Sequence, residues 1–346
     1  MKHLVSTQIY DVDQERIEEI VRQVQPRISA VGLGGAGCNV ISWIKERGMV
    51  GGRLLALNTD ANHLAICKAD RRILIGEQIT HGLGCGGYPE KGERALQENL
   101  DQILKELKGA GIVFLVAGLG GGTGTGAICA LAEALKSRGP LVVGVVTLPF
   151  EIERVRMDTA KKGIKRLIKA CNTVVAIDNN KLVKVSGDLP FQQALGVANE
   201  LVGVFIKDIT ETIATASLIN LDFMDLRTIM EKSGIAAIGA GWGTGEDRVE
   251  KAVKNALDGQ LLDINDITKA YGVLVHVSGG EDLTLEEVFR AGKLVTRTIS
   301  PESRIVWGAR VNPELQETAH VFICLTGVES AFLSEQSKRR KIFKFI

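Results

Sequence analysis

A glycine-rich segment at residues 118–126, with the sequence Gly-Leu-Gly-Gly-Gly-Thr-Gly-Thr-Gly, constrains the fold of this chain more than any other feature. An apolar run at 112–117 precedes it, and 127–135 has the composition of a helix. A strand, a glycine loop and a helix in this order bring backbone N–H groups and a helix N-terminus to one point, where they bind phosphate. The chain contains no Gly-Lys-Ser/Thr, so the segment is not a Walker A loop. It therefore predicts a phosphorylated ligand held by another kind of loop.

Short apolar runs alternate with helical patterns through the first half of the chain. The expected helices are one at 11–25, one that ends near residue 47, and one at 91–107. The expected strands lie at 27–31, 54–57, 72–75, 112–117, 141–147 and 173–177. This alternation is typical of a doubly wound parallel sheet, whose ligands bind beyond the carboxyl ends of the strands.

The pattern changes after a long helix expected at 189–215. The strands expected beyond it lie at 272–278, 304–311 and 320–326, with one helix at 285–298, which favours a mixed or antiparallel sheet. The predicted fold class is therefore α/β, with a doubly wound, Rossmann-like parallel sheet joined by a long central helix to a smaller α+β domain. The predicted divisions are a helical extension at 1–26, a ligand-binding domain with the central helix at 27–215, a C-terminal domain at 216–328, and a basic, apolar tail at 329–346.

Charge and composition exclude several classes of protein. The 42 Lys and Arg residues nearly balance the 41 Asp and Glu residues, so the net charge of +1 favours neither nucleic acid nor an anionic membrane as a partner. No apolar stretch approaches the length of a membrane span, and the first 25 residues lack the apolar core of a signal peptide. We therefore expect a cytoplasmic protein without direct membrane insertion.

The six cysteines and five histidines are dispersed and form no CxxC pair. This pattern is typical of reduced thiols in a cytoplasm, and no metal site built from protein ligands is expected. Cys38, Cys85 and Cys129 border the expected phosphate loops. They are either a redox-sensing trio or, in the preferred interpretation, small buried hydrophobic residues.

A second glycine motif offers an alternative function. Gly32, Gly34 and Gly37 follow a strand, and Asp60 ends the next one, which matches the dinucleotide-binding fingerprint of an NAD-dependent enzyme. That fold does not require the signature at 118–126 or a further glycine loop at 82–87. The second half also lacks an obvious hydride-transfer constellation. Three glycine loops at one sheet edge favour a triphosphate over a pyrophosphate.

The combined pattern resembles the tubulin/FtsZ superfamily, and within it the FtsZ family of cell-division GTPases, with an archaeal character. The segments that carry the resemblance are 32–39, 58–61, 82–90, 118–126, 179–182 and 220–227, within a similarity that covers about 27–328. The resemblance implies GTP or GDP and Mg²⁺ as ligands. It also implies a head-to-tail homopolymer and a place in a division ring.

By this resemblance, the glycine loops surround the phosphates and Mg²⁺, and other residues contact the ribose and base. Backbone donors suit phosphates, whereas amides and a carboxylate suit the guanine edge. The residues implied at the phosphates are Gly34, Gly35, Ala36, Asp60, Gly84, Cys85, Gly86, Gly120, Gly121, Gly122, Thr123, Gly124, Thr125 and Gly126. Those implied at the ribose side are Glu153 and Arg156, and those at guanine are Asn39, Asn179, Asn199 and Glu200.

Two positions near the expected base depart from the family pattern. Leu195 stands where a guanine-stacking Phe is usual, and Glu200 stands where Asp is usual. An aliphatic side chain covers a base without π-stacking, and Glu is one methylene longer. The loop at 149–156 is also one residue shorter than usual. We expect GTP specificity to persist with altered affinity.

Three polar residues far along the chain are the implied catalytic groups. The resemblance assigns Asn220, Asp222 and Asp225 to a loop that enters the nucleotide site of the next subunit and orients the attacking water. An interface of this head-to-tail kind produces a filament. The alternative is that Asp222 and Asp225 only cap a helix that begins near Phe223.

Two further questions remain open at the level of sequence. A paralogue that binds GTP and forms a scaffold with little turnover is the second candidate function, although the two acidic residues argue against it. The segment at 337–346 is basic with an apolar end. It is either a docking peptide for a membrane-anchoring division adaptor or a solvated terminus.

Overall fold

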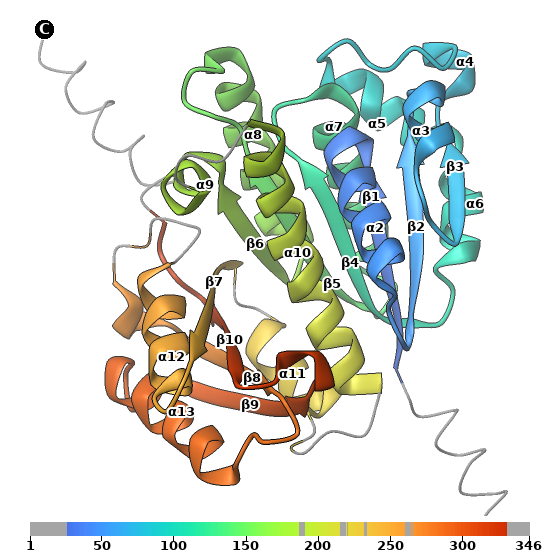
Figure 1. Cartoon of the computed structure of the whole chain (residues 1–346). Helices are drawn as coiled ribbons and strands as arrows, with labels where there is room; N and C mark the ends of the chain where they lie inside the picture. The colour runs from blue at the N-terminus through green and yellow to red at the C-terminus, as the bar shows by residue number, and fades with distance from the viewer. Residues whose placement is uncertain are drawn as a thin grey trace, which may run out of the picture.

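The computed structural model describes residues 26–186, 191–214, 219, 221–231, 234–259, 264 and 266–330. The helix expected at 11–25 and the tail segment at 331–346 lie outside the described residues. The described chain forms two lobes on either side of a long helix (Figure 1). Its strands make one sheet with the order β3-β2-β1-β4-β5-β6-β7-β10-β8-β9.

The first six strands are parallel and form the predicted doubly wound sheet. Their apolar runs are buried on both faces; in β5, for example, seven of eight residues are buried. All six expected strands are found, five with slightly longer bounds and β3 with the same length but shifted by one residue. These are β1 (Arg27–Leu33), β2 (Gly52–Asn58), β3 (Arg71–Leu74), β4 (Ala110–Gly118), β5 (Leu141–Leu148) and β6 (Thr173–Asp178).

Helices cover both faces of this sheet and make two separate hydrophobic cores. One face carries α2 (Gly34–Arg47), α3 (Ala61–Ile66) and the central helix α10 (Phe191–Ala214). The other carries α5 (Pro89–Glu98), α6 (Leu100–Glu106), α7 (Gly122–Leu135) and α8 (Arg154–Ala170). Two short helices that the sequence did not predict, α4 (Glu77–Thr80) and α9 (Asn179–Ser186), lie in the connecting segments.

Two helix predictions need correction. The single helix expected at 91–107 is interrupted at Asn99, whose side-chain oxygen accepts a hydrogen bond from the backbone N–H of Gly76 at 3.0 Å. This tertiary contact outweighs the helical pattern on either side. Helix α7 begins at Gly122, inside the glycine signature, rather than after it.

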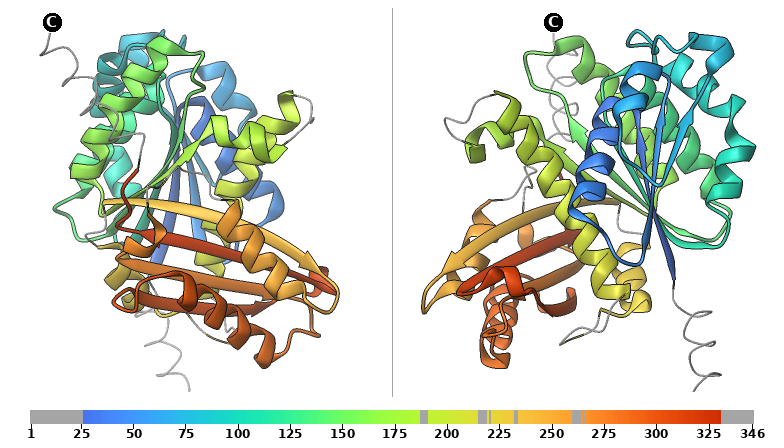
Figure 2. Two further views of the ribbon diagram at one scale, coloured as in Figure 1. Left: turned by 90° about the vertical axis from the view of Figure 1, so that its left-hand side faces the viewer. Right: turned by 45° about the vertical axis from the view of Figure 1, so that its right-hand side comes forward.

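The second lobe has a mixed arrangement of strands, one of the two that the sequence favoured, and β10 lies antiparallel between β7 and β8 (Figure 2). Strand β9 is parallel to β8. The elements are α11 (Phe223–Met230), β7 (Gly234–Thr244), α12 (Arg248–Asp258), η1 (Ile267–Lys269), β8 (Gly272–Gly279), α13 (Leu285–Thr298), β9 (Arg304–Val311), η2 (Pro313–Leu315) and β10 (Thr318–Thr326).

The sequence did not predict β7 or α12, and their packing explains why. Strand β7 is rich in Gly and Ala, which have low strand propensity. Helix α12 lies directly on these glycines, so that a Cβ at Gly239 would stand 2.0 Å from the carbonyl oxygen of Ala256. Small residues are required there for helix contact, and they hide the usual strand pattern.

The two lobes meet along α10 and a short strand pairing. Strands β6 and β7 pair through only three residue pairs, which begin at Thr173 and Gly234. On α10, the buried carboxylate of Glu211 accepts hydrogen bonds from Lys207 Nζ at 2.8 Å and from the backbone N–H of Val50 at 3.2 Å. It also pairs with Arg310 of β9. One side chain of α10 therefore ties both lobes together.

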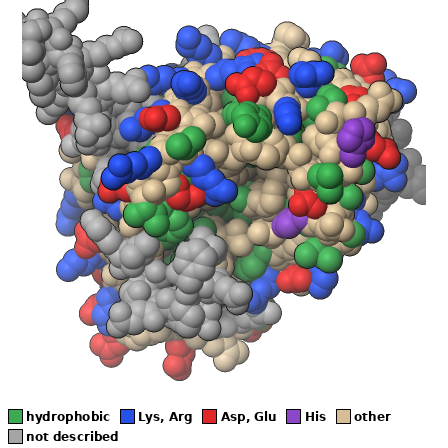
Figure 3. Space-filling model, turned by 90° about the horizontal axis from the view of Figure 1, so that it is seen from above, with side chains coloured by type: hydrophobic (Ala, Val, Ile, Leu, Met, Phe, Trp, Pro, Cys, Tyr) green, Lys and Arg blue, Asp and Glu red, His purple; other side chains and the backbone are tan. Residues whose placement is uncertain are grey.

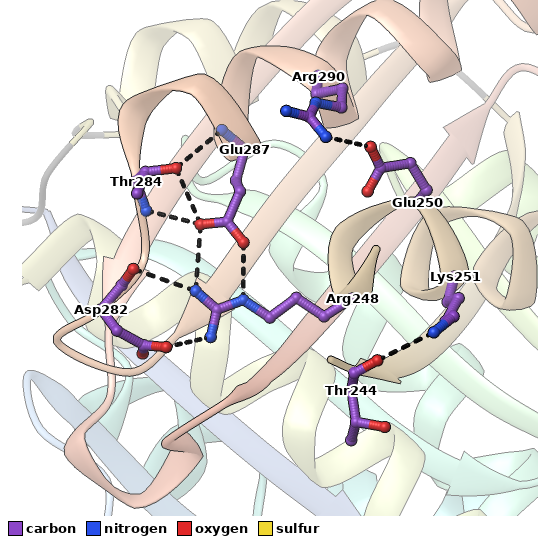
Figure 4. Close-up of polar contacts among 8 residues, drawn as sticks. All are labelled: Thr244, Arg248, Glu250, Lys251, Asp282, Thr284, Glu287 and Arg290. Atoms are coloured by element: carbon purple, nitrogen blue, oxygen red, sulfur yellow. Dashed lines mark hydrogen bonds and ion pairs between the residues drawn. The ribbon is translucent and has the colours of Figure 1, made fainter. Parts of the chain in front are cut away.

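A buried arginine holds α12 against α13 (Figure 4). Arg248 is only 5% exposed, and its Nε donates to Glu287 Oε1 at 2.7 Å. The same guanidinium pairs with the carboxylate of Asp282 and donates to its backbone oxygen at 3.1 Å. Glu287 also completes a capping box with Thr284 at the start of α13. Hydrogen bonding to Arg248, above all, lowers the pKa of Glu287 to about 2.

Replacing Arg248 by Ala is expected to lower the free energy of unfolding by about 2 kcal/mol, because it removes the buried guanidinium that hydrogen-bonds the partly buried carboxylate of Glu287. Arg290→Ala is the matched control, since its guanidinium is solvent-exposed and its pair with Glu250 should contribute little to stability. Because the pKa of Glu287 is depressed, its contribution is present above pH 4.5 and is lost as the pH falls toward 2. Urea unfolding of both variants at neutral and acid pH measures the difference, and equal losses would contradict the assignment.

Candidate nucleotide site

A pocket of about 310 Å³ lies where the carboxyl ends of β1, β4 and β5 meet. Figure 3 looks onto this end of the molecule and shows a hollowed surface with basic, acidic and hydrophobic side chains around it. The pocket residues come from the ends of these three strands and from the loops and helices that follow them, with Asn179 from the start of α9. They are Leu33, Gly35, Ala36, Gly118, Leu119, Gly121, Gly122, Thr123, Gly124, Thr147, Pro149, Glu153, Arg156 and Asn179.

Two helix N-termini face this pocket. Helices α2 and α7 each contain 14 residues, and neither has a side-chain cap for its first backbone N–H groups. Uncapped donors at the positive end of a helix dipole are the usual basis of phosphate binding. Gly120 has φ +101°, which only glycine adopts readily, and Gly121 borders open space, since a Cβ there would meet no atom within 4 Å. The signature therefore leaves open space at Gly121, beside the uncapped N-terminus of α7.

Part of the glycine signature serves helix packing instead. A Cβ at Gly126 would lie 1.9 Å from the carbonyl oxygen of Pro89, and one at Gly122 would lie 2.7 Å from Cys85 Cβ. The Thr125 hydroxyl is used within the loop, where it accepts from the backbone N–H of Gly120 at 2.9 Å. A ligand is therefore not the only reason for so many glycines; close contact between α5 and α7 is another.

Loops after β2 and β3 close one side of the pocket. Thr59 Oγ1 lies 2.6 Å from Thr123 Oγ1 of the signature and 3.5 Å from the sulfur of buried Cys85. Gly84 and Gly86 flank Cys85 in this loop. Asp60 caps α3 by accepting from the backbone N–H of His63 at 3.0 Å. No motif in the sequence marked His63 as a site residue.

The side of the pocket expected to hold the ribose carries one pair of opposite charges. Glu153 and Arg156, at the start of α8, form an ion pair at 2.7 Å. Glu153 also accepts from the backbone N–H of Phe150 at 3.1 Å. Arg156 keeps 64% of its side chain exposed, and it is the basic residue of the pocket lining. Its guanidinium is therefore available to an anionic ligand.

Asn179, at the start of α9, carries an unsatisfied acceptor. Its Oδ1 is buried, and no residue in the described part of the chain donates a hydrogen bond to it. A buried acceptor without a donor is costly, so the geometry favours a ligand that supplies an N–H at this point. Guanine carries such donors on its Watson–Crick edge.

The remaining base-side residues separate into two groups. Helix α10 packs on α2 through Gly203, where a Cβ would lie 2.3 Å from the ring of Trp43. Asn39 stands one turn before Trp43 and Asn199 one turn before Gly203, so both lie next to the contact between the helices, but neither lines the pocket. Glu200 points elsewhere and lines a second pocket with Trp242. The side chain of Leu195 lies outside the described residues.

The implied catalytic acids are not brought to this pocket. Asp222 caps α11 by accepting from the backbone N–H of Met224 at 2.9 Å, and both Asp222 and Asp225 are exposed. Phe223 packs near Gly111 at the start of β4, 3.8 Å from a Cβ built there. Asn220 lies outside the described residues.

A second contact holds α11 at the amino ends of the parallel strands. Thr173 Oγ1, at the start of β6, donates to the backbone oxygen of Met230 at 2.5 Å. The glycine signature begins at Gly118, at the opposite end of β4, so the two sites lie about 23 Å apart at the usual strand rise.

The cysteines and the spacing of potential metal ligands do not favour redox or metal chemistry in the described part of the chain. All six cysteines are buried free thiols, and burial raises the pKa of Cys129 and of Cys324 to about 12. These thiols suit hydrophobic packing better than redox sensing. Within the described ranges, no group of three His, Cys, Asp or Glu side chains is placed to hold a metal ion. The same part of the chain contains no helix with the length and apolar character needed to cross a membrane.

Comparison with protein families covers both lobes. Residues 27–187 match the model of the Tubulin/FtsZ family, GTPase domain, and residues 234–329 match the FtsZ family, C-terminal domain. Together with the parallel sheet and its pocket, these matches define a tubulin-like GTPase.

Individual relatives narrow this class. The chain is 45% identical to cell division protein FtsZ 2 of Methanocaldococcus jannaschii, over 92% of this chain and 84% of that protein. It is 44% identical to cell division protein FtsZ 1 of Archaeoglobus fulgidus, over 92% and 87%. A solved structure, an empty FtsZ dimer from M. jannaschii, is similar with a TM-score of 0.86 and 42% identity over 91% of this chain and 93% of that one. The chain belongs to the FtsZ family of cell-division GTPases, which confirms the predicted family and fold class.

Proposed function

We propose that this chain binds GTP in the pocket, assembles head to tail, and hydrolyses GTP only where two subunits meet. The observation that carries the proposal is the distance, within one chain, between the phosphate-binding helix ends and the acidic residues of α11. The uncapped helix N-termini lie at the carboxyl ends of the parallel strands. The exposed acids Asp222 and Asp225 lie near the opposite ends of these strands, about 23 Å away. A second subunit that places its α11 over the pocket supplies the missing acids.

Nucleotide binding divides between the two sides of the pocket. The N-termini of α2 and α7 hold the phosphates, Arg156 adds a positive charge, and Asn179 accepts from guanine with Asn39 and Asn199 nearby. Mg²⁺ bound with a nucleotide takes most of its ligands from phosphate oxygens and water. This suits a pocket whose described lining holds no cluster of acidic side chains.

Hydrolysis then depends on the partner's α11. Its carboxylates orient and polarise the attacking water, and the fixed phosphate loops stabilise the charge on the transferred phosphoryl group. Each subunit offers one pocket and one acidic end, so the contact repeats without closing and gives a protofilament. The dimer seen for the FtsZ of M. jannaschii supports association between copies of this chain.

In the cell, we place this polymer in a cytoplasmic ring at the division site. The proposed division of the chain is an extension at 1–26, a GTPase domain at 27–215, a C-terminal domain at 216–328 and a tail at 329–346 that docks on a membrane-anchored adaptor. A GTP-binding scaffold with little turnover is the second candidate, favoured by the cap that occupies one oxygen of Asp222. An NAD enzyme is the distant third.

Sedimentation in the presence of GTP, GDP or ATP, with phosphate release followed in parallel, separates these candidates. The proposal predicts that GTP alone causes extensive sedimentation and that phosphate release rises steeply with protein concentration. Sedimentation without phosphate release would favour the scaffold. Binding of a nicotinamide dinucleotide without any response to GTP would overturn the proposal.

A further inference from the structure

The imidazole ring of His63 lies beside the phosphate loops and is not among the groups assigned to GTP above. His63 lies on α3, and its Nε2 stands 3.8 Å from the position of a Cβ at Gly35, in the loop that opens α2. Its other ring nitrogen, Nδ1, lies 3.3 Å from Asn58 Nδ2 and 3.4 Å from the sulfur of Cys67. The ring is therefore held at one nitrogen, and the other faces Gly35, which lines the pocket.

The hydrogen bonds of Asn58 fix the tautomer of this ring. Asn58 Oδ1 accepts from the backbone N–H groups of Thr59 at 2.9 Å and of Asp60 at 3.3 Å. Its amide NH₂ must then be the group that faces His63, and an amide NH₂ can only donate. Nδ1 of His63 is consequently the acceptor, so the proton of the neutral ring is on Nε2. The N–H that faces Gly35 has no acceptor among the described residues.

The order of the strands indicates which part of a nucleotide lies there. Asn179 follows β6 and His63 follows β2, and the order β2-β1-β4-β5-β6 separates them by about 19 Å at the usual spacing of strands. A nucleoside triphosphate whose base is at Asn179 therefore extends its phosphate chain across the ends of β5, β4 and β1. Its terminal phosphate comes to the loop after β2.

We propose that His63 donates a hydrogen bond from Nε2 to the terminal phosphate of the bound nucleoside triphosphate and so distinguishes GTP from GDP. The inference rests on the proposed binding of GTP with its base at Asn179. The preset tautomer means that no proton has to move when the ligand binds. A diphosphate does not reach the ring, so His63 contributes only to the affinity for GTP.

Affinities of the full chain for GTP and GDP, measured by calorimetry below the assembly concentration, test the proposal. His63→Ala is expected to weaken GTP binding by about tenfold and to leave GDP binding unchanged. His63→Gln, which keeps an N–H donor, should recover most of the GTP affinity. Ile66→Ala is the control, because this residue is 78% exposed on the same helix.

Each outcome separates the inference from the proposed function. Equal losses of GTP and GDP affinity in His63→Ala would mean a structural role for the ring and would overturn the inference. Nitrogen NMR of ring-labelled histidine, assigned with His63→Gln, should show the proton on Nε2; a proton on Nδ1 would also overturn it. Failure of the unmodified chain to bind either nucleotide would instead reject the proposed function itself.

Discussion

In an Asp222→Asn variant, GTP hydrolysis is expected to fall by about 100-fold while GTP binding stays unchanged, because a general-base contribution of that size is lost. The amide oxygen of Asn can still accept the hydrogen bond from the backbone N–H of Met224, so the cap of α11 is retained. The substitution therefore removes the carboxylate without removing the cap. Phosphate release and GTP affinity, measured on the same preparation, give the two values.

The control for the acids of α11 is an exposed acid at the start of another helix, matched in setting to Asp225. Asp101 is exposed in the first turn of α6, just as Asp225 is in the first turn of α11. Asp101→Asn should leave turnover unchanged, whereas Asp225→Asn should reduce it. If Asp222→Asn hydrolysed GTP as fast as the unmodified chain, Asp222 would be a capping residue only, and the scaffold would become the better account.

Gly121→Val is expected to weaken GTP binding by about 100-fold, equivalent to about 2.8 kcal/mol, without unfolding the protein. The backbone at Gly121 is extended, with φ −87° and ψ 168°, which Val adopts readily. A Cβ at this position meets no protein atom within 4 Å, so the new side chain occupies the space meant for phosphate. Calorimetry with GTP and thermal unfolding without it give the two readings.

A second glycine with open space provides the comparison for Gly121→Val. Gly292 lies within α13 in the other lobe, and a Cβ there also meets nothing within 4 Å. Gly292→Val should preserve GTP affinity. Unaltered GTP binding by Gly121→Val would place the phosphates elsewhere and remove the basis of the proposed site.

The sequence predicted the parallel half of the fold well and the second lobe less well. Strands such as β5 are buried on both faces, so continuous apolar runs mark them clearly. Strand β7 was missed because its glycines serve the contact with α12. The interruption at Asn99 depends on a hydrogen bond to Gly76, which no local pattern contains.

At the candidate site, too, the sequence predicted the motifs but not the packing of individual residues. The signature predicted a phosphate pocket, but only the packing distances separate Gly121, which is open, from Gly126, which lies against α5. Asn199 and Glu200 are neighbours in sequence, but Glu200 lines a different pocket, with Trp242, which the motif alone does not reveal. The orientation of His63 depends on contacts with Asn58 that the sequence order does not reveal. Motifs predicted the chemistry, whereas side-chain placement required the tertiary structure.

Completion of the site by a second subunit is the central claim, and mixing two inactive variants tests it most directly. One variant, Asp222→Asn with Asp225→Asn, keeps an intact pocket; the other, Gly121→Val, keeps intact acids on α11. Each alone should release little phosphate from GTP. If hydrolysis occurs between subunits, a mixture should recover turnover, because the acids of the second variant reach the pocket of the first. A mixture no more active than the sum of its separate components would contradict the claim.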